Sequence, residues 1–175
     1  MSMIGYVLGL SPAQVKALRA KPSLATDVAS AGLGMGGDLR QLGPLQEALE
    51  LEKSWHILHY LFTGTLDDTS SPGAALLSGE ELGEDLGYGP PRLHDERATA
   101  AFARFLETQD LAKLQVRVSC EEMGRIGIYG VPMGPSSDSS YDDELREEVG
   151  FFFPQLRDYV LQVAQKQGGL LVWLS

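Results

Sequence analysis

The fold is decided by two adjacent stretches near the N-terminus, Met3-Ile4-Gly5-Tyr6-Val7-Leu8-Gly9-Leu10 and Ser11-Pro12-Ala13-Gln14. The first stretch is apolar and mixes β-branched, aromatic and aliphatic residues, which favours a strand over residues 3–10. In the second, Ser11 suits a helix N-cap and Pro12 the first helical position, while Gln14 is placed to close a capping box. The sequence therefore predicts a strand that leads directly into a short helix.

A second strand-sized apolar run lies near the other end of the chain, Leu170-Leu171-Val172-Trp173-Leu174. Gly168 and Gly169 come just before it and end the preceding helical pattern. We expect the two terminal strands to pair in a small sheet that helices cover, which gives a mostly helical α+β fold. A length of 175 residues suits one domain over residues 1–175.

Helical periodicity accounts for most of the chain between these strands. The predicted helices cover residues 23–31, residues 44–62 with Gly64 after the end, the residues from Asp95 as N-cap to about 106, residues 111–123, and residues 145–163 with a kink or restart at Pro154. Val116, Val118 and Cys120 also alternate as in a strand. Residues 134–143 are polar and predict a loop.

The charge balance excludes several classes of partner. Asp and Glu number 24 against 14 Lys and Arg, for a net charge of −10. Nucleic acids and anionic membranes bind proteins through a basic surface, and a chain this acidic is not expected to present one, so we expect neither as a partner. The apolar runs at both ends are too short to span a bilayer, and no basic leader precedes the first. A cytoplasmic location is expected, and the single cysteine, Cys120, suits that reducing compartment.

Candidate site residues gather between residues 52 and 59. On a continuous helix Glu52, Trp55, His56 and His59 would share one broad face, where a buried carboxylate or histidine is costly unless it is paired. Three interpretations stay open: a buried hydrogen bond to His59, a ligand or partner pocket that uses His59, and a metal site. Because the histidines and Glu52 offer only three ligands, we expect no metal, and the sequence indicates no cofactor.

Other motifs carry weaker signals. Residues 32–37 match the letters of a dinucleotide fingerprint, but the expected strand before them is missing, so a connecting loop is favoured. The sequence contains no nucleophile elbow, and Cys120 is typical of a small core residue. The turn Gly87-Tyr88-Gly89-Pro90-Pro91 carries Arg92, which would either pair with a carboxylate such as Glu52 or Asp85 or bind an anionic ligand.

Several of these residues together resemble the YfbM-like family, bacterial single-domain proteins of unknown function. The resemblance is carried by Met3-Ile4-Gly5-Tyr6, Trp55-x-x-Leu58-His59-x-Leu61-x-Thr63-Gly64, Leu77-x-Gly79, Gly83-x-Asp85-x-Gly87-Tyr88-Gly89-Pro90-x-Arg92, Ile128-Tyr129, and the closing helix with Leu156, Tyr159 and Ala164. The family has no established activity to carry over. The resemblance implies one site formed by Trp55, His59, Thr63, Tyr88, Arg92 and Tyr129.

The leading functional hypothesis is a non-catalytic binding domain for an unknown small molecule or protein. Trp55 and Tyr88 would form the walls of its pocket, with His59 and Arg92 as polar anchors. One alternative is an enzyme for a small anionic substrate, with His59 as the candidate general base and Arg92 as anion anchor. Another is an immunity- or inhibitor-like protein that binds a basic partner through its acidic surface. The motif could also be purely structural, and the oligomeric state is open.

Overall fold

A five-stranded antiparallel sheet organises the computed structural model, which describes residues 2–31, 38–133 and 139–175. The strand order is β2-β1-β5-β4-β3. The two terminal strands, β1 (Gly5–Leu10) and β5 (Gly169–Leu174), pair along their whole length, from Gly5 opposite Leu174 to Leu10 opposite Gly169. The predicted pairing of the terminal strands and the α+β fold class are confirmed.

Three very short strands widen this sheet. β2 (Leu49–Glu50) pairs with β1, β4 (Arg92–His94) pairs with β5, and β3 (Glu80–Glu81) pairs with β4. None of the three was predicted from the sequence, because runs of two or three residues are too short to show a period. β4 is the strand that matters most below, since it carries Arg92.

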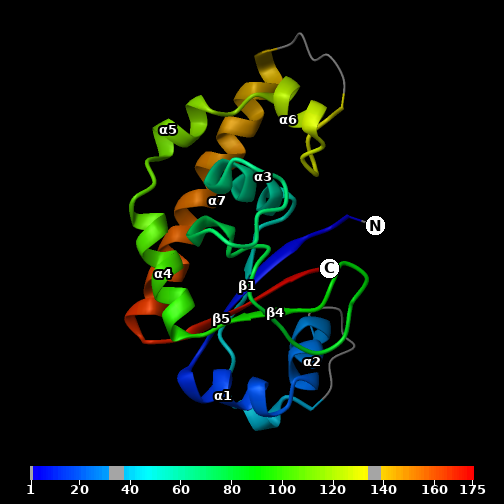
Figure 1. The fold of residues 1–175 in the computed structure, drawn as a ribbon, viewed down its shortest axis with the longest axis vertical. Coiled ribbons are helices and arrows are strands. Elements are labelled where there is room, and N and C mark those ends of the chain that lie inside the picture. Colours follow the sequence, from blue (N-terminus) through cyan, green and yellow to red (C-terminus); the bar gives the residue numbers. More distant parts are fainter. Residues whose placement is uncertain (1, 32–37, 134–138) are drawn as a thin grey trace.

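Helices cover both faces of the sheet (Figure 1). α1 (Pro12–Ala20) and α2 (Ser23–Ala31) lie on one face. On the opposite face α4 (Glu96–Glu107) and α7 (Ser139–Gln165) pack against the strands. α3 (Ser54–Thr63), α5 (Leu111–Val116) and α6 (Cys120–Ile126) pack on α7 and complete this layer. A hydrophobic core lies on each face of the sheet, and β5 contributes side chains to both because side chains alternate along a strand. Leu171 and Trp173 pack toward α1 and α2, and Leu170 and Val172 pack into the larger core on the opposite face.

Helix ends that depend on local chemistry agree with the sequence. Ser11 and Gln14 form the predicted capping box, in which the Ser11 hydroxyl accepts from the Gln14 amide at 3.2 Å. Asp95 caps α4 by accepting from the Ala98 amide at 2.9 Å. Gly64 ends α3 in the left-handed conformation, with φ of 78°. These signals act within one helical turn, so they can be read without knowing the fold.

The helix predicted over residues 44–62 is wrong in its first half. Leu49 and Glu50 pair with β1, and Glu52 has a φ of 50°, which no right-handed helix accommodates. The helix begins only at Ser54. The pairing of this segment with the sheet edge overrides its helical spacing, so Glu52 does not share a helix face with His56 and His59.

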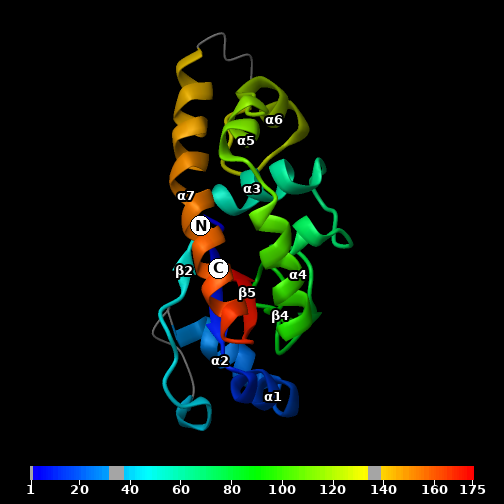
Figure 2. The same ribbon diagram turned by 90° about the vertical axis from the view of Figure 1, so that its left-hand side faces the viewer.

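Two further predictions need correction. α7 begins at Ser139, so the second part of the loop expected at residues 134–143 is helical, while residues 134–138 lie outside the described residues. α7 continues through Pro154 as one helix, so it does not restart there, and α3, α4 and α5 pack along it (Figure 2). The expected helix over residues 111–123 divides into α5 and α6, and the glycine-rich residues 32–37 also fall outside the described part.

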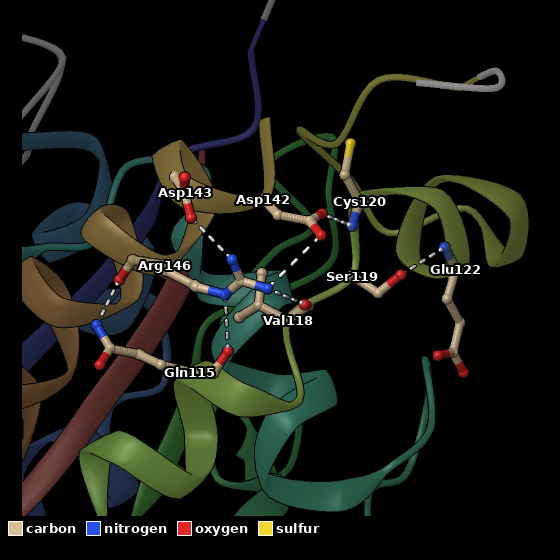
Figure 3. A network of polar contacts seen from close by, with 8 residues as sticks. All are labelled: Gln115, Val118, Ser119, Cys120, Glu122, Asp142, Asp143 and Arg146. Carbon is tan, nitrogen blue, oxygen red and sulfur yellow. Dashed lines mark hydrogen bonds and ion pairs between the residues drawn. The ribbon is translucent and has the colours of Figure 1, made fainter. Parts of the chain in front are cut away.

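A polar network joins α5 and α6 to α7 (Figure 3). Arg146 on α7 donates from Nε to the Gln115 carbonyl at 3.3 Å and from Nη2 to the Val118 carbonyl at 3.5 Å. Its Nη2 also lies 3.6 Å from a carboxylate oxygen of Asp142, which in turn accepts from the Cys120 amide at 2.7 Å. Arg146 thus provides donors for carbonyl groups at and just after the end of α5, and Asp142 beside it accepts from the first amide of α6.

Candidate functional site

Trp55 and Tyr129 hold the N-terminal segment in place. The Trp55 indole N–H donates to the Met3 carbonyl at 3.2 Å, and the Met3 amide donates to the Tyr129 hydroxyl at 2.8 Å. The two rings stack with centroids 6.1 Å apart. Gly5 lies so close to Trp55 that an added Cβ would stand 2.7 Å from the Trp55 Cβ. Motif residues from three parts of the chain therefore form one structural clamp at the start of β1.

His56 belongs to the same assembly, although it lies outside the family motifs. Its Nδ1 accepts from the Tyr129 amide at 2.9 Å, so the proton must reside on Nε2, which donates to the Leu66 carbonyl at 3.2 Å. Burial lowers the pKa of His56, which keeps the ring neutral. Its ring stacks on Trp55 with centroids 4.7 Å apart. His56 therefore joins α3 to two loops through backbone contacts.

His59 is fully buried, with an exposed fraction of 0%. Neither ring nitrogen finds a hydrogen-bond partner among the described residues. Burial lowers the pKa of His59 to about 4, and the neighbouring His56 adds to the shift. The backbone carbonyl of His59, rather than its ring, accepts from the Thr63 hydroxyl at 2.9 Å. The described residues do not provide the buried hydrogen bond that was one interpretation of His59.

Metal binding finds no support in this region. In residues 2–31, 38–133 and 139–175, no three His, Cys, Asp or Glu side chains are grouped as metal ligands would be. The ring centroids of His56 and His59 are 6.4 Å apart. Both ring nitrogens of His56 already form hydrogen bonds with backbone groups.

Arg92 lies on β4, opposite Val172 of β5, which directs its side chain to the face covered by α3 and α4. Across the described part of the chain its guanidinium makes no ion pair, and its Nη1 is buried without a hydrogen-bond partner. The pairing with Glu52 or Asp85 considered from the sequence is therefore not formed there. Asp85 instead accepts from the Gly87 and Gly89 amides, at 2.7 and 2.9 Å.

The turn that precedes Arg92 lies against its guanidinium. Gly89 has a φ of 92°, and a Cβ added there would stand 3.0 Å from Nη2 of Arg92. Glycine is thus required both by the backbone conformation and by the close approach. Tyr88, half-buried, packs against the core on the same face of the sheet. The Gly-Tyr-Gly motif and Arg92 form one local unit, which we call the Arg92 turn.

The six residues implied by the resemblance therefore fall into two groups. Trp55, His59 and Thr63 lie on α3, with Tyr129 stacked on the first of them. Tyr88 and Arg92 belong to the Arg92 turn. No hydrogen bond, ion pair or aromatic contact between described residues joins the two groups, so a single site that unites them stays a prediction.

His94 is a candidate that the sequence analysis passed over. It is only 6% exposed, its Nε2 lies 2.9 Å from the Ala75 carbonyl, and it lines a cavity of about 250 Å³. Gly79, with a φ of 126°, packs so tightly here that an added Cβ would stand 3.1 Å from the His94 Nε2 and the Arg92 Cβ. The alternation Arg92-Leu93-His94 was the available signal, because residues two apart on a strand share a face.

Two other features have a structural explanation. A cavity of about 410 Å³ between α1 and α4 has Arg19 in its wall, but this side chain already pairs with Glu80 at 2.8 Å and with Asp95 at 3.3 Å. Cys120 is buried, and burial raises the pKa of its thiol, which suits a core residue rather than a nucleophile. Its sulfur also points away from Asp142 (Figure 3).

Fold and site together define a small α+β domain with an antiparallel sheet, helices on both faces and, at the start of β4, an arginine that pairs with no carboxylate among the described residues. The chain belongs to the family described as "Domain of unknown function (DUF1877)", whose model matches residues 1–173. The crystal structure of YfbM, a protein of unknown function from Escherichia coli, is similar over 98% of this chain and 99% of that one, with a TM-score of 0.72 and 18% identity. The resemblance to the YfbM-like family is confirmed, and at that identity the structural likeness shows the fold alone. No curated protein matches the chain significantly.

No helix in the described ranges is both long and apolar enough to cross a membrane.

Proposed function

We propose that this protein is a non-catalytic binding domain for a small anion, which Arg92 anchors. The observation that carries the proposal is the Nη1 group of Arg92, buried and without an acceptor among the described residues. Arginine stays charged in proteins, so it cannot escape this situation by losing a proton. A buried charged donor without a partner is expensive, and a carboxylate or phosphate oxygen is the acceptor that a guanidinium binds best.

The surroundings of Arg92 suit such a ligand. Gly89 lets the backbone of the turn approach Nη2 without a side chain between them. Tyr88 of the same turn supplies a half-buried aromatic side chain, a residue type common in ligand sites. The net charge of −10 repels a free anion at long range, so we expect binding to be modest and to depend on the local contacts rather than on the overall field.

The other predicted residues support binding more than catalysis. A general base must come within hydrogen-bond reach of its substrate, and the His59 side chain has no exposed surface, whereas that of Arg92 is half-exposed. Trp55, His59, Thr63 and Tyr129 enter the proposal as the frame around α3. The immunity- or inhibitor-like alternative rests on net charge alone and stays a prediction. A cytoplasmic location is part of the proposal and is supported by the buried, unpaired Cys120.

The test is thermal unfolding of wild type and Arg92→Gln in rising concentrations of inorganic phosphate or malonate, at constant ionic strength. A ligand at about 100 times its Kd stabilises by about 2.7 kcal/mol, which raises the Tm by several degrees. We expect a saturable rise in wild type and its loss in Arg92→Gln.

The matched control is Arg97→Gln, which removes an exposed arginine of α4 and changes the net charge equally. Phosphate stabilises many proteins by exclusion from their surface, and this effect should be the same in all three proteins. The proposal fails if Arg92→Gln keeps the full rise, or if neither anion gives wild type a saturable one.

A further inference from the structure

The cavity beside His94 has a lining unlike that of the Arg92 turn. It measures about 250 Å³ and lies between β4, α4 and the 3₁₀ turn Pro72–Ala74. Its polar wall consists of Ser70, Ser71, Ser78 and His94, and its apolar wall includes Ala98 and Ala101 of α4. No Asp, Glu, Lys or Arg side chain is among its described lining residues. A charged ligand would find no counter-ion there, so the cavity suits an uncharged one.

His94 presents a lone pair that the described residues leave unused. The Ala75 carbonyl can only accept a hydrogen bond, so the Nε2 at 2.9 Å from it must carry the proton. Nδ1 is therefore the unprotonated nitrogen. Burial lowers the pKa of His94, while the Ala75 and Ser78 backbones and the Asp95 carboxylate act in the opposite direction. In the neutral ring Nδ1, for which no hydrogen bond to a described residue is found, can accept from a ligand hydroxyl or amide N–H.

Ser71 adds a second polar atom to the wall. Its hydroxyl oxygen is buried, and no hydrogen-bond geometry links it to a described group. The hydroxyl nevertheless lies near the Asp68 carboxylate, and this proximity lowers the pKa of Asp68. A proton turned toward Asp68 leaves the lone pairs of the Ser71 oxygen for a donor in the cavity. His94 and Ser71 both line this cavity, and each side chain carries an atom that can accept a hydrogen bond.

We infer that this cavity is a second binding site, independent of the Arg92 anion site, for a small uncharged molecule with a hydroxyl or amide donor and a short apolar end. The donor binds to His94 Nδ1, and the apolar end packs against the alanines of α4. The volume is at the small end of the range for ligand pockets, so the ligand is a fragment-sized molecule or the tip of a longer one.

The test uses isobutyramide as probe and follows the ¹⁵N chemical shifts of the histidine rings by NMR, with the His94 signals assigned through His94→Gln. We expect a saturable shift of His94 Nδ1 with a millimolar Kd, typical of so small a probe. Isobutyrate, which has the same shape and a charge, should bind at least about tenfold more weakly, since its charge must be desolvated.

Two variants fill the cavity, Ala98→Leu and Ala101→Leu, and Ala100→Leu is the matched control on the same helix. Ala100 is half-buried like the other two but is not among the lining residues. We expect either filling variant, once shown to be folded by its thermal transition, to abolish the shift, and Ala100→Leu to retain it. The inference is overturned if wild type shows no saturable shift, if both folded filling variants bind as wild type does, or if isobutyrate binds as tightly as isobutyramide.

Discussion

His59, which is fully buried, and Arg92, which is half-buried, both carry buried polar atoms without a partner among the described residues, but they respond to this differently. His59 can shed its charge, and the fall of its pKa to about 4 means that only a neutral ring remains to be accommodated at pH 7. A guanidinium stays charged in proteins, and Nη1 of Arg92 has no acceptor among the described residues. This difference is the reason to assign the ligand to Arg92 and a structural role to His59.

The substitution His59→Leu tests that assignment for the histidine. Leucine removes the two unpartnered nitrogens and keeps an apolar group in the core, so we expect the free energy of unfolding at pH 7 to be unchanged or higher, within about 1 kcal/mol. His94→Leu is the contrast, because it leaves the Ala75 carbonyl without its donor and should cost about 1–3 kcal/mol. Urea unfolding of both variants measures this. A large loss in His59→Leu would contradict the account.

The same residue predicts an acid dependence. Between the unfolded pKa of about 6.5 and the folded value of about 4, the unfolded chain binds a proton at His59 that the folded chain does not. Stability is therefore complete above pH 6.5 and falls as the pH drops toward 4, by at most about 3 kcal/mol from this group. Because burial also lowers the pKa of His56 and His94, the relevant quantity is the difference between wild type and His59→Leu. If the free energy of unfolding depended on pH identically in wild type and His59→Leu, the lowered pKa of His59 would be refuted.

Among the elements, helix ends set by local signals were predicted correctly. Short segments whose structure depends on pairing with a distant strand were not. The capping box at Ser11 and the glycine at position 64 act within a turn, and both were read correctly. Residues 44–53 carry a helical spacing, yet within them Leu49 and Glu50 pair with β1, and only the finished sheet provides that partner. The three-residue strand β4, which positions Arg92, was invisible for the same reason. The motif around Arg92 could be found from the sequence, but its unpaired state could not.

Arg146 provides the prediction for the packing of elements. Replacing it by methionine removes the donors to the Gln115 and Val118 carbonyls, and we expect a loss of about 1–2 kcal/mol in the free energy of unfolding. Arg157→Met is the control: both side chains are 37% exposed on α7, but the only ion pair of Arg157 with a described residue is with its neighbour Asp158, and its guanidinium lies over a phenylalanine ring. Urea unfolding compares them. Equal losses in the two variants would show that the network joining α5 and α6 to α7 contributes little.

For the molecule as a whole, the two terminal strands explain why so much of the architecture was predictable. Once β1 and β5 pair, the alternation of β5 separates two cores, and helices must cover both faces. The candidate site was less predictable, because it depends on which polar side-chain atoms have no hydrogen-bond partner in the folded protein. A missing acceptor for Arg92 and a free nitrogen on His94 are properties of the folded environment, and residue order does not reveal them.

The most direct test of the central claim is a crystal structure of the protein grown with inorganic phosphate. We predict a phosphate oxygen within hydrogen-bond distance of Nη1 of Arg92, beside Gly89 of the Arg92 turn, and no such density in crystals of Arg92→Gln. A structure in which Nη1 instead donates to a protein carbonyl or carboxylate, or in which phosphate leaves this guanidinium unoccupied, would contradict the account.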